Sequence, residues 1–241
     1  MILFVVPAYD KEQNIGRLIE EIHRFTRSKN YSYRLFVVDD GSRDRTAQVV
    51  LTESKLYPVT LISYRPNRGV QEAFRRGFHA ALSEAKETDL IVTLEADGTA
   101  DREILPVFME KIAQGFDVVV ASYYAKGGSV EGTVCHRKLL SLAGNFFIRH
   151  FLRIKGVRTY SSFYRIYKPA ALRKVLELHG DFFEEKGFAC VVELLLRLDR
   201  AGFRIGEVPM ILKGSARIGK SKMKVFQTVL GYLRIAFRHA V

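Results

Sequence analysis

The sequence predicts an α/β fold, in which a mostly parallel, Rossmann-like β-sheet carries helices on both faces. Short apolar runs alternate with amphipathic segments over the first hundred residues. These runs are apolar throughout, as in strands that are buried on both faces of a parallel sheet. Two of them end in acidic turns that contain glycine, DDGS and EADG. A β-α-β order implies right-handed crossovers, so the carboxyl ends of the strands meet at one edge.

The elements of the first half follow from hydrophobic periodicity and capping residues. Strands are predicted at residues 2–6, 34–38, 59–64, 90–94 and 117–122. The helices between them are predicted at residues 14–27, 46–54, 71–85 and 103–114. Ser42 or Asp44 can cap the second of these helices.

The second half is richer in helix and in basic residues. Helices are predicted at residues 137–155, 170–178, 188–201 and 224–239, and strands at 161–168 and 204–212. The last helix is amphipathic. Its predicted apolar face consists of Phe226, Val229, Leu230, Leu233, Ala236 and Phe237. With no linker or repeat, we expect one domain with parts at residues 1–122, 123–223 and 224–241.

The charge balance restricts the partners of the chain. Lys and Arg number 38 against 26 Asp and Glu, a net charge of +12, which favours nucleic acid, an anionic membrane or phosphorylated substrates. No zinc-ligand spacing or nucleic-acid-binding motif is present, so we expect no nucleic acid partner. Two cysteines without CxxC spacing fit a reducing cytosol, and no apolar run approaches the ~20 residues that cross a bilayer.

Glu95 and Asp97 form the most informative motif. Residues i and i+2 of an extended chain point to the same side, and paired carboxylates suit a divalent cation that also holds a diphosphate. A solvated acidic turn is the plainer interpretation. Asp39 and Asp40, which end a second strand, favour the cation, because massed carboxylates repel one another unless a cation neutralises them.

Ordered motifs along almost the whole chain resemble the family-two glycosyltransferases, and among them the dolichol-phosphate mannose synthases and polyprenyl-phosphate sugar transferases. The motifs are Pro7-Ala8-Tyr9 with Asn14-Ile15, VVDDGSRDRT at 37–46, Asn67-Arg68-Gly69, LEADG at 94–98, Arg137-Lys138 with Ser141 and Asn145, SSFYRIY at 161–167, and GEVPM followed by RIGKSK at 217–222. The resemblance implies an A-type glycosyltransferase fold, with a nucleotide-sugar-binding half at 1–122 and an acceptor half with a closing loop at 123–223.

The resemblance also implies roles for individual residues. Asp97, Arg217 and Lys222 would be catalytic, and Glu95 and Asp97 would hold Mg²⁺ or Mn²⁺. The donor-binding residues would be Pro7, Tyr9, Asp39, Asp40, Gly69, Glu95 and Ala96. The acceptor-binding residues would be Arg137, Ser141, Arg165 and Ser221.

By the same resemblance, the protein would transfer a sugar from a GDP- or UDP-linked donor to a polyprenyl phosphate, with metal dependence and inversion. Two basic amphipathic helices beside the proposed lipid-phosphate site favour peripheral attachment at the cytoplasmic face of a membrane. The chain departs from the family pattern at Lys11, Glu95, Tyr123, Thr159 and Val191, which bears on the donor sugar and on turnover.

Other interpretations remain open. A soluble or glycan acceptor would use the same donor site, and a binding-only relative would keep the fold without turnover. Residues 214–221 also match G-x-x-x-x-G-K-S, the phosphate-binding loop of nucleotide triphosphatases. Only about one helix follows that match, whereas a P-loop domain places most of its sheet downstream.

Overall fold

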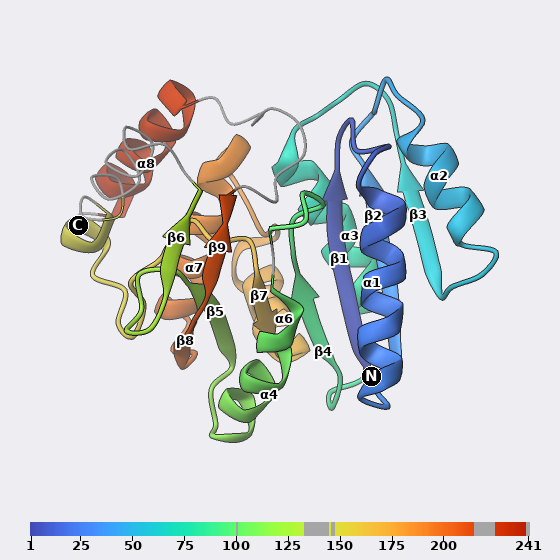
Figure 1. The fold of residues 1–241 in the computed structure, drawn as a ribbon. Helices are drawn as coiled ribbons and strands as arrows, with labels where there is room; N and C mark the ends of the chain where they lie inside the picture. The colour runs from blue at the N-terminus through green and yellow to red at the C-terminus, as the bar shows by residue number, and fades with distance from the viewer. Residues whose placement is uncertain (100, 133–144, 146–147, 215–224, 240–241) are drawn as a thin grey trace.

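The computed structural model describes residues 1–99, 101–132, 145, 148–214 and 225–239. Its centre is a seven-stranded sheet in the order β3-β2-β1-β4-β7-β5-β8 (Figure 1). The strands are β1 (Ile2–Ala8), β2 (Tyr33–Asp39), β3 (Val59–Ser63), β4 (Leu90–Thr93), β5 (Val118–Ser122), β7 (Arg165–Tyr167) and β8 (Ile205–Pro209). Only β7 runs antiparallel to its neighbours in this sheet, so the predicted mostly parallel sheet is confirmed.

Helices cover both faces of the sheet because successive residues of each strand point to opposite sides. In β1, Phe4 and Val6 pack with α1 (Ile15–Ser28), α2 (Thr46–Glu53) and α4 (Leu105–Ala113). Leu3 and Val5 pack on the other side with α3 (Val70–Glu84), α6 (Pro169–His179) and α7 (Cys190–Arg200). The short 3-10 helices η1 (Arg102–Ile104) and η2 (Gly187–Ala189) precede α4 and α7.

Two predicted strands differ from the observed ones. The predicted strand at 161–168 is regular only over β7, because the preceding loop holds Thr93 Oγ1 through the carbonyl of Phe163 (2.6 Å). The predicted strand at 204–212 breaks at Met210, whose N–H donates to the Ser122 carbonyl. Beyond the break, β9 (Ile211–Lys213) pairs in parallel with β6 (Ser129–Glu131) in a separate two-stranded sheet that the sequence did not predict.

The predicted helix at 137–155 lies largely outside the described residues, and its described part is helical over residues 148–152. On the last helix, α8 (Val225–His239), the single apolar face that we predicted is divided. Ile235 and Ala236 of this helix are buried, whereas Val229 is 40% and Phe237 is 77% exposed. The helix docks through one edge of its apolar surface, because Arg234 and Arg238 form ion pairs with the buried Glu185.

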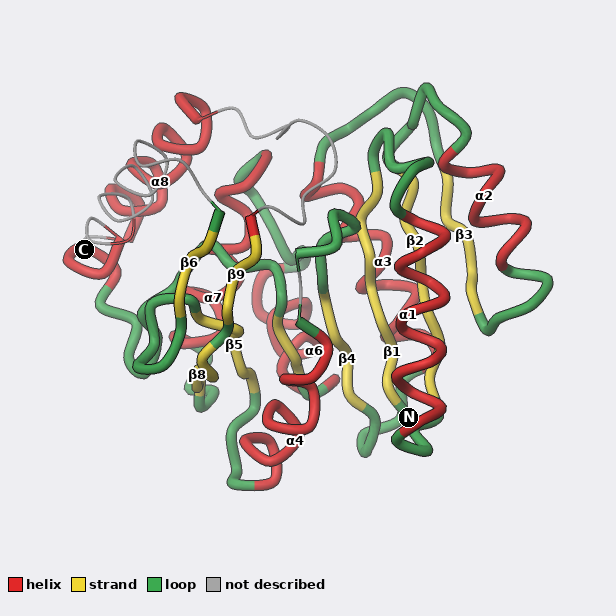
Figure 2. The backbone as a smooth tube through the Cα atoms, viewed as in Figure 1, coloured by secondary structure: helices red, strands yellow, loops and turns green. Residues whose placement is uncertain are grey.

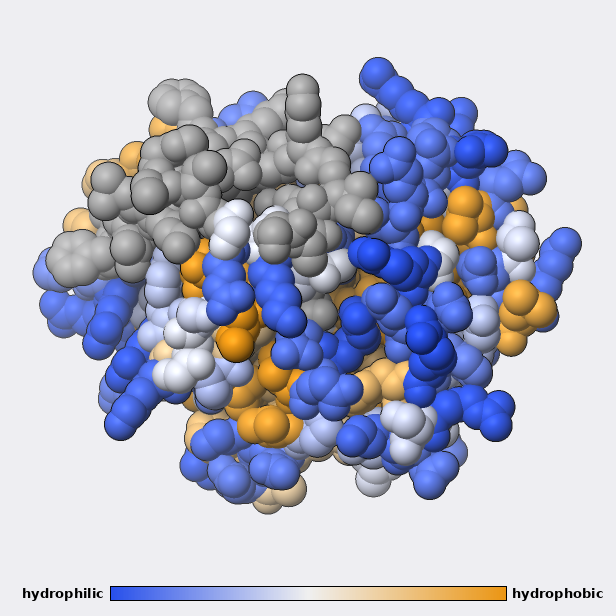
Figure 3. All heavy atoms as spheres, in the orientation of Figure 1, coloured by the Kyte–Doolittle hydropathy of each residue, from blue (hydrophilic) through white to orange (hydrophobic). Residues whose placement is uncertain are grey.

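The strand order positions a site at one edge of the sheet. The chain proceeds outward from β1 to β3 and then returns to place β4 on the other side of β1. Ligands of open α/β sheets bind outside the carboxyl ends of the strands at such a reversal. Those ends point to the upper edge of the views in Figures 1 and 2, where loops continue from β1, β2 and β4. On the face shown in Figure 3, hydrophilic side chains surround smaller apolar patches.

Candidate active site

The loops after β1 and β2 are joined by hydrogen bonds from main chain to side chain. The Asp10 N–H donates to Ser42 Oγ (2.9 Å), and the Lys11 N–H donates to Thr46 Oγ1 (2.7 Å). Tyr9, a predicted donor-binding residue, lies between Asp10 and the end of β1. At Lys11, a departure from the family pattern, the backbone makes this contact whatever the side chain. The first loop is therefore fixed against the second.

Asp39 is the last residue of β2 and Asp40 follows it, and both are buried. Asp39 accepts hydrogen bonds from the Ser42 N–H (3.0 Å) and the Ser63 hydroxyl (2.9 Å). Asp40 accepts from Asn67 Nδ2, the Arg68 N–H and the Gly69 N–H, at 2.7–2.9 Å. Burial raises the pKa of Asp40, although hydrogen bonds from Arg68 and Gly69 oppose the shift. These two carboxylates hold Ser63 and residues 67–69 against the end of β2, and their contact with a donor stays a prediction.

Two glycines allow this close approach. Gly41 has a φ of +70°, and a Cβ there would lie 2.7 Å from the backbone nitrogen of Asn67. Gly69 has a φ of +93°, and a Cβ there would lie 2.7 Å from Gln71 Oε1. Gly41 therefore needs glycine for backbone conformation and for space, whereas Gly69 needs it chiefly for its positive φ. We call the segment 67–69, which Asp40 holds, the donor turn.

The acidic segment after β4 lies next to β1. Asp97 is buried, and its Oδ1 accepts from the Thr99 N–H (3.1 Å) and hydroxyl (2.6 Å). Asn14, just before α1, donates its side-chain amide to the Ala96 carbonyl (3.5 Å). The loops after β1, β2 and β4, with the predicted donor-binding residues Pro7, Glu95 and Ala96, thus gather at the reversal of strand order.

The carboxylate side chains at this edge of the sheet are of the type that binds a hard divalent cation. Among the described residues, no three His, Cys, Asp or Glu side chains cluster as metal ligands. Magnesium in phosphate-transfer sites is commonly held by one or two carboxylates and completed by substrate phosphates and water. Glu95 and Asp97, with the Thr99 hydroxyl on Asp97, supply that kind of partial set.

The structure buries Arg165, which we predicted to bind the acceptor. Its side chain is 0% exposed. Its guanidinium donates from Nε to the Ser162 carbonyl (2.8 Å), from Nη1 to the Val191 carbonyl (2.7 Å) and from Nη2 to the Tyr160 carbonyl (2.6 Å). Arg165 therefore fixes the loop before β7 to the start of α7, and its predicted contact with an acceptor stays a prediction. Val191, a departure from the family pattern, contacts Arg165 through its main-chain carbonyl, so a valine side chain is compatible with this hydrogen bond.

Two departures from the family pattern lie together. The resemblance places an arginine at Tyr123 and an acidic residue near Thr159. Here the Tyr123 hydroxyl and Ser161 Oγ are 3.1 Å apart, and Ser122 Oγ and Thr159 Oγ1 are 2.8 Å apart. Neutral hydrogen bonds occupy both positions. The paired change leaves no unpaired buried charge, which would be costly at this depth.

The remaining predicted residues fall outside the described part of the chain. They are Arg137 and Ser141, in residues 133–144, and Arg217, Ser221 and Lys222, in residues 215–224. The P-loop match at 214–221 lies almost wholly in the second of these ranges. Their roles stay predictions. The ends of β6 and β9 are neighbours, since Glu131 pairs with Lys213, so the two segments leave the described structure from adjacent points.

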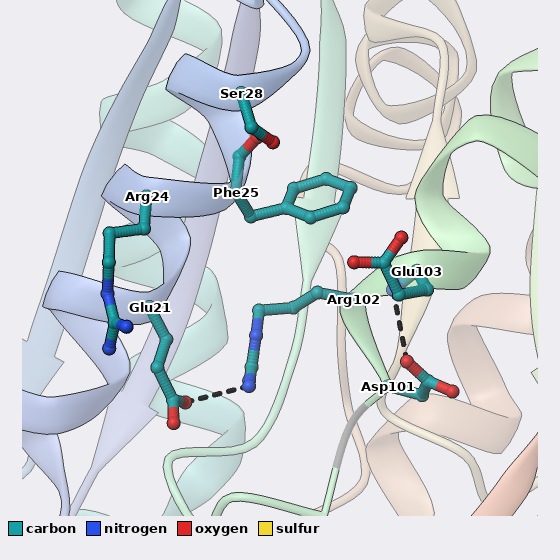
Figure 4. A pocket seen from close by; sticks show the side chains of 7 residues that line it. All are labelled: Glu21, Arg24, Phe25, Ser28, Asp101, Arg102 and Glu103. Atoms are coloured by element: carbon teal, nitrogen blue, oxygen red, sulfur yellow. Dashed lines mark hydrogen bonds and ion pairs between the residues drawn. The ribbon is translucent and has the colours of Figure 1, made fainter.

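A shallow pocket lies between α1 and η1, and Figure 4 shows its lining. Arg102 enters it from η1 and forms an ion pair with Glu21 of α1 (2.8 Å). The Glu103 N–H donates to Asp101 at the same place (3.0 Å). Arg102 and Glu21 thus neutralise one another across the pocket, and none of the residues predicted for the site lines it.

Sequence reasoning missed Thr99 and Gln71. Thr99 orients Asp97, and Gln71 contacts both the donor turn and a distant loop. A threonine two residues after an aspartate is the available signal for the first, because such residues bond local backbone and side chains. A glutamine in the first turn of a helix is ordinarily solvated, so nothing in the sequence identifies the second.

Comparison with known proteins gives the family. The model of "Glycosyl transferase family 2" matches residues 3–176. A dolichol-phosphate mannosyltransferase of Pyrococcus furiosus is 32% identical over 236 residues, covering 97% of this chain and 62% of that protein. A polyprenol monophosphomannose synthase of Mycolicibacterium smegmatis is 26% identical over 223 residues, covering 92% and 80%. The chain thus spans less than two thirds of the length of the first relative.

Solved structures agree on the fold. Glucosyl-3-phosphoglycerate synthase from Mycobacterium tuberculosis, crystallised with Mn²⁺, UDP and phosphoglyceric acid, superposes with a TM-score of 0.68 at 16% identity, over 98% of this chain and 78% of that one. Mannosyl-3-phosphoglycerate synthase from Rubrobacter xylanophilus gives 0.66 at 17%, over 99% and 73%. The A-type glycosyltransferase fold is therefore confirmed. Since the family model spans more than half of the chain, the protein belongs to glycosyl transferase family 2.

Proposed function

We propose that this protein transfers a sugar from a nucleoside diphosphate sugar to a polyprenyl phosphate, with Glu95 and Asp97 holding Mg²⁺ or Mn²⁺. The observation that carries the proposal is the meeting of the loops after β1, β2 and β4 at the reversal of strand order. The names of the two relatives and the metal in the tuberculosis enzyme's structure support it. The P-loop alternative lacks support, because the sheet precedes that segment.

The chemistry asks little of a general base. A polyprenyl phosphate oxygen is already anionic near neutral pH, so it can attack the anomeric carbon directly and invert it. A bound divalent cation would supply charge neutralisation for the departing diphosphate. Asp97 is held in one orientation by Thr99, and the fixed first and second loops would orient the nucleotide and exclude water from it. The closing loop, with Arg217 and Lys222, would add positive charge near the leaving group.

The donor is tested by thermal unfolding with GDP- and UDP-linked sugars, with and without Mn²⁺. A donor at 100 times its dissociation constant adds about 2.7 kcal/mol to the unfolding free energy. For a chain of this length that corresponds to a rise in Tm of roughly 5–10 °C. One nucleotide should stand out, and only with the metal. Equal stabilisation in EDTA would contradict the metal site, and no stabilisation by any donor would favour the binding-only interpretation or another ligand.

The acceptor proposal places the protein at a membrane surface. Within the described residues, no helix is long and apolar enough to cross a bilayer. Residues 1–131 carry 17 basic against 19 acidic residues, whereas residues 132–241 carry 21 against 7. The net positive charge therefore lies entirely in residues 132–241, which contain α8 and the helical residues 148–152. Each basic residue near anionic lipid contributes about 1 kcal/mol to membrane binding.

Liposome flotation tests this attachment. Phe237 of α8 is 77% exposed and Phe151 is 51% exposed, with exposed Arg149 and Arg153 beside the latter. Binding should rise with anionic lipid, fall at high salt, and drop severalfold in Phe151→Glu and Phe237→Glu, because each change removes an apolar side chain that can insert and introduces a negative charge that the anionic surface repels. Leu56→Glu is the matched control, since Leu56 is 72% exposed and lies after α2 in the less basic half. Equal loss in the control, or no binding at low salt, would favour a soluble acceptor.

A further inference from the structure

Gln71 makes two hydrogen bonds that join segments far apart in the sequence. It lies in the first turn of α3 and its side chain is largely buried. Its Nε2 donates to the Arg68 carbonyl (2.6 Å), and its Oε1 accepts from the Gly187 N–H (2.8 Å). Both polar atoms of the amide are therefore used on main-chain groups.

The first of these bonds reaches the donor turn. Arg68 and Gly69 give their N–H groups to Asp40, so the turn is fixed from one side by Asp40 and from the other by Gln71. Asp40 directly follows β2, which ends at Asp39, at the proposed donor site. A change in the position of Gln71 thus alters the support of the donor turn without any contact between Gln71 and a ligand.

The second hydrogen bond of Gln71, from the Gly187 N–H, reaches a segment that is held in place by further contacts. Glu193 is buried, and its carboxylate accepts from the Glu184 N–H and the Glu185 N–H at 2.7–3.1 Å. Phe188, the residue after Gly187, stacks on Phe163, with ring centroids 5.2 Å apart and planes 12° apart. Residues 184–189, which we call the acceptor-side segment, are therefore anchored to Glu193 of α7 and to Phe163 of the loop before β7.

The helix α8 packs against this acceptor-side segment. A Cβ added at Gly231 would come within 2.5 Å of Ala189 Cβ, so the helix lies directly against η2. Arg234 Nη1 and Glu185 Oε2 are 3.2 Å apart, and Arg238 Nη2 and Glu185 Oε1 are 3.1 Å apart. In Figure 1, α8 lies at the opposite end of the molecule from α2.

We propose that Gln71 is a positioning residue, which couples the donor turn to the acceptor-side segment on which α8 rests. Through its two hydrogen bonds, the donor turn reaches its binding conformation only when the acceptor-side segment is in place. This inference rests on the proposed function, because it assumes that the loops beside Asp40 bind a nucleotide. Couplings of this kind typically change affinity about fivefold or more.

The test compares Gln71→Met and Gln71→Glu with the wild type. Methionine keeps the length and loses both bonds, whereas glutamate keeps the acceptor for the Gly187 N–H and loses the donor to the Arg68 carbonyl. Calorimetry with GDP and with UDP, each with Mn²⁺, measures nucleotide affinity, and amide hydrogen exchange measures protection of Gly187. Gln48→Met, an exposed position on α2, is the control.

We expect Gln71→Met to lose at least about fivefold in affinity and to exchange faster across the acceptor-side segment. Gln71→Glu should keep Gly187 protected and bind weakly at pH 8. Its affinity relative to wild type should recover as the pH falls, because a protonated carboxyl can again donate to the Arg68 carbonyl. A merely structural role would not produce that pH profile.

Wild-type affinity in Gln71→Met, unchanged protection of Gly187, or a Gln71→Glu affinity ratio that is independent of pH would each overturn the inference. Failure of the wild type to bind either nucleotide would instead overturn the proposed function, and this inference with it. Binding by the wild type with no effect in Gln71→Met would overturn the inference alone.

Discussion

Replacing Asp97 by asparagine is expected to reduce sugar transfer by about a hundredfold or more, since a positioned charge at the leaving group is worth that much in comparable sites. Asparagine keeps the shape and the acceptor that Thr99 uses, so the fold should persist. What it removes is the negative charge that a divalent cation needs. Thermal unfolding should accordingly show no gain in nucleotide stabilisation on adding Mn²⁺.

Glu95→Asp provides the matched control for Asp97→Asn. It preserves the charge and shortens the side chain by one methylene, and aspartate is the residue that the family pattern places there. We expect it to keep metal-dependent binding. If Asp97→Asn binds nucleotide with Mn²⁺ as tightly as the wild type does, the metal does not reside at this strand end.

Replacing Arg165 by lysine is expected to lower the free energy of unfolding by about 3–5 kcal/mol. A lysine ammonium cannot reach three carbonyls that a planar guanidinium spans, and each buried carbonyl left without a donor costs about 1–3 kcal/mol. Arg158→Lys is the control, because Arg158 is exposed and its guanidinium is 3.8 Å from the Glu207 carboxylate. A surface pair of that kind contributes about 0–1 kcal/mol. Urea unfolding measures both.

Equal stability of the two variants would mean that Arg165 does not support the loop before β7. If Arg165→Lys were also to raise the KM for the acceptor while the unfolding free energy stayed constant, a direct contact with the acceptor would be restored as the better interpretation. The burial of Arg165 and its three carbonyl partners predict the opposite pattern.

The fold of the first half was predictable because its signals are local. Apolar runs and helical periodicity identified β1 to β5 with their helices to within a few residues. The second half depends on contacts that the sequence does not encode locally. β7 is only three residues long and is a strand because β4 and β5 lie on either side of it. The faces of α8 were mistaken because Glu185, distant in sequence, decides which side of the helix docks.

The site shows the same division. The acidic strand ends could be identified from spacing, since strand geometry alone brings them to one edge. The partners of their carboxylates could not, because Asp40 is satisfied by residues 67–69 and Asp39 by Ser63. The burial of Arg165 could not be predicted either, because an arginine in a motif gives no indication of its burial. Pairing of Tyr123 with Ser161 likewise required the fold.

The most direct test of the central claim is transfer of a labelled sugar from GDP- and UDP-linked donors to a short-chain polyprenyl phosphate in anionic vesicles with Mn²⁺. The account predicts that label enters the organic phase with one donor, that EDTA or Asp97→Asn abolishes it, and that the product is the inverted glycosyl phosphate. Transfer that persists in EDTA or in Asp97→Asn, or label that reaches only water-soluble acceptors, would contradict it.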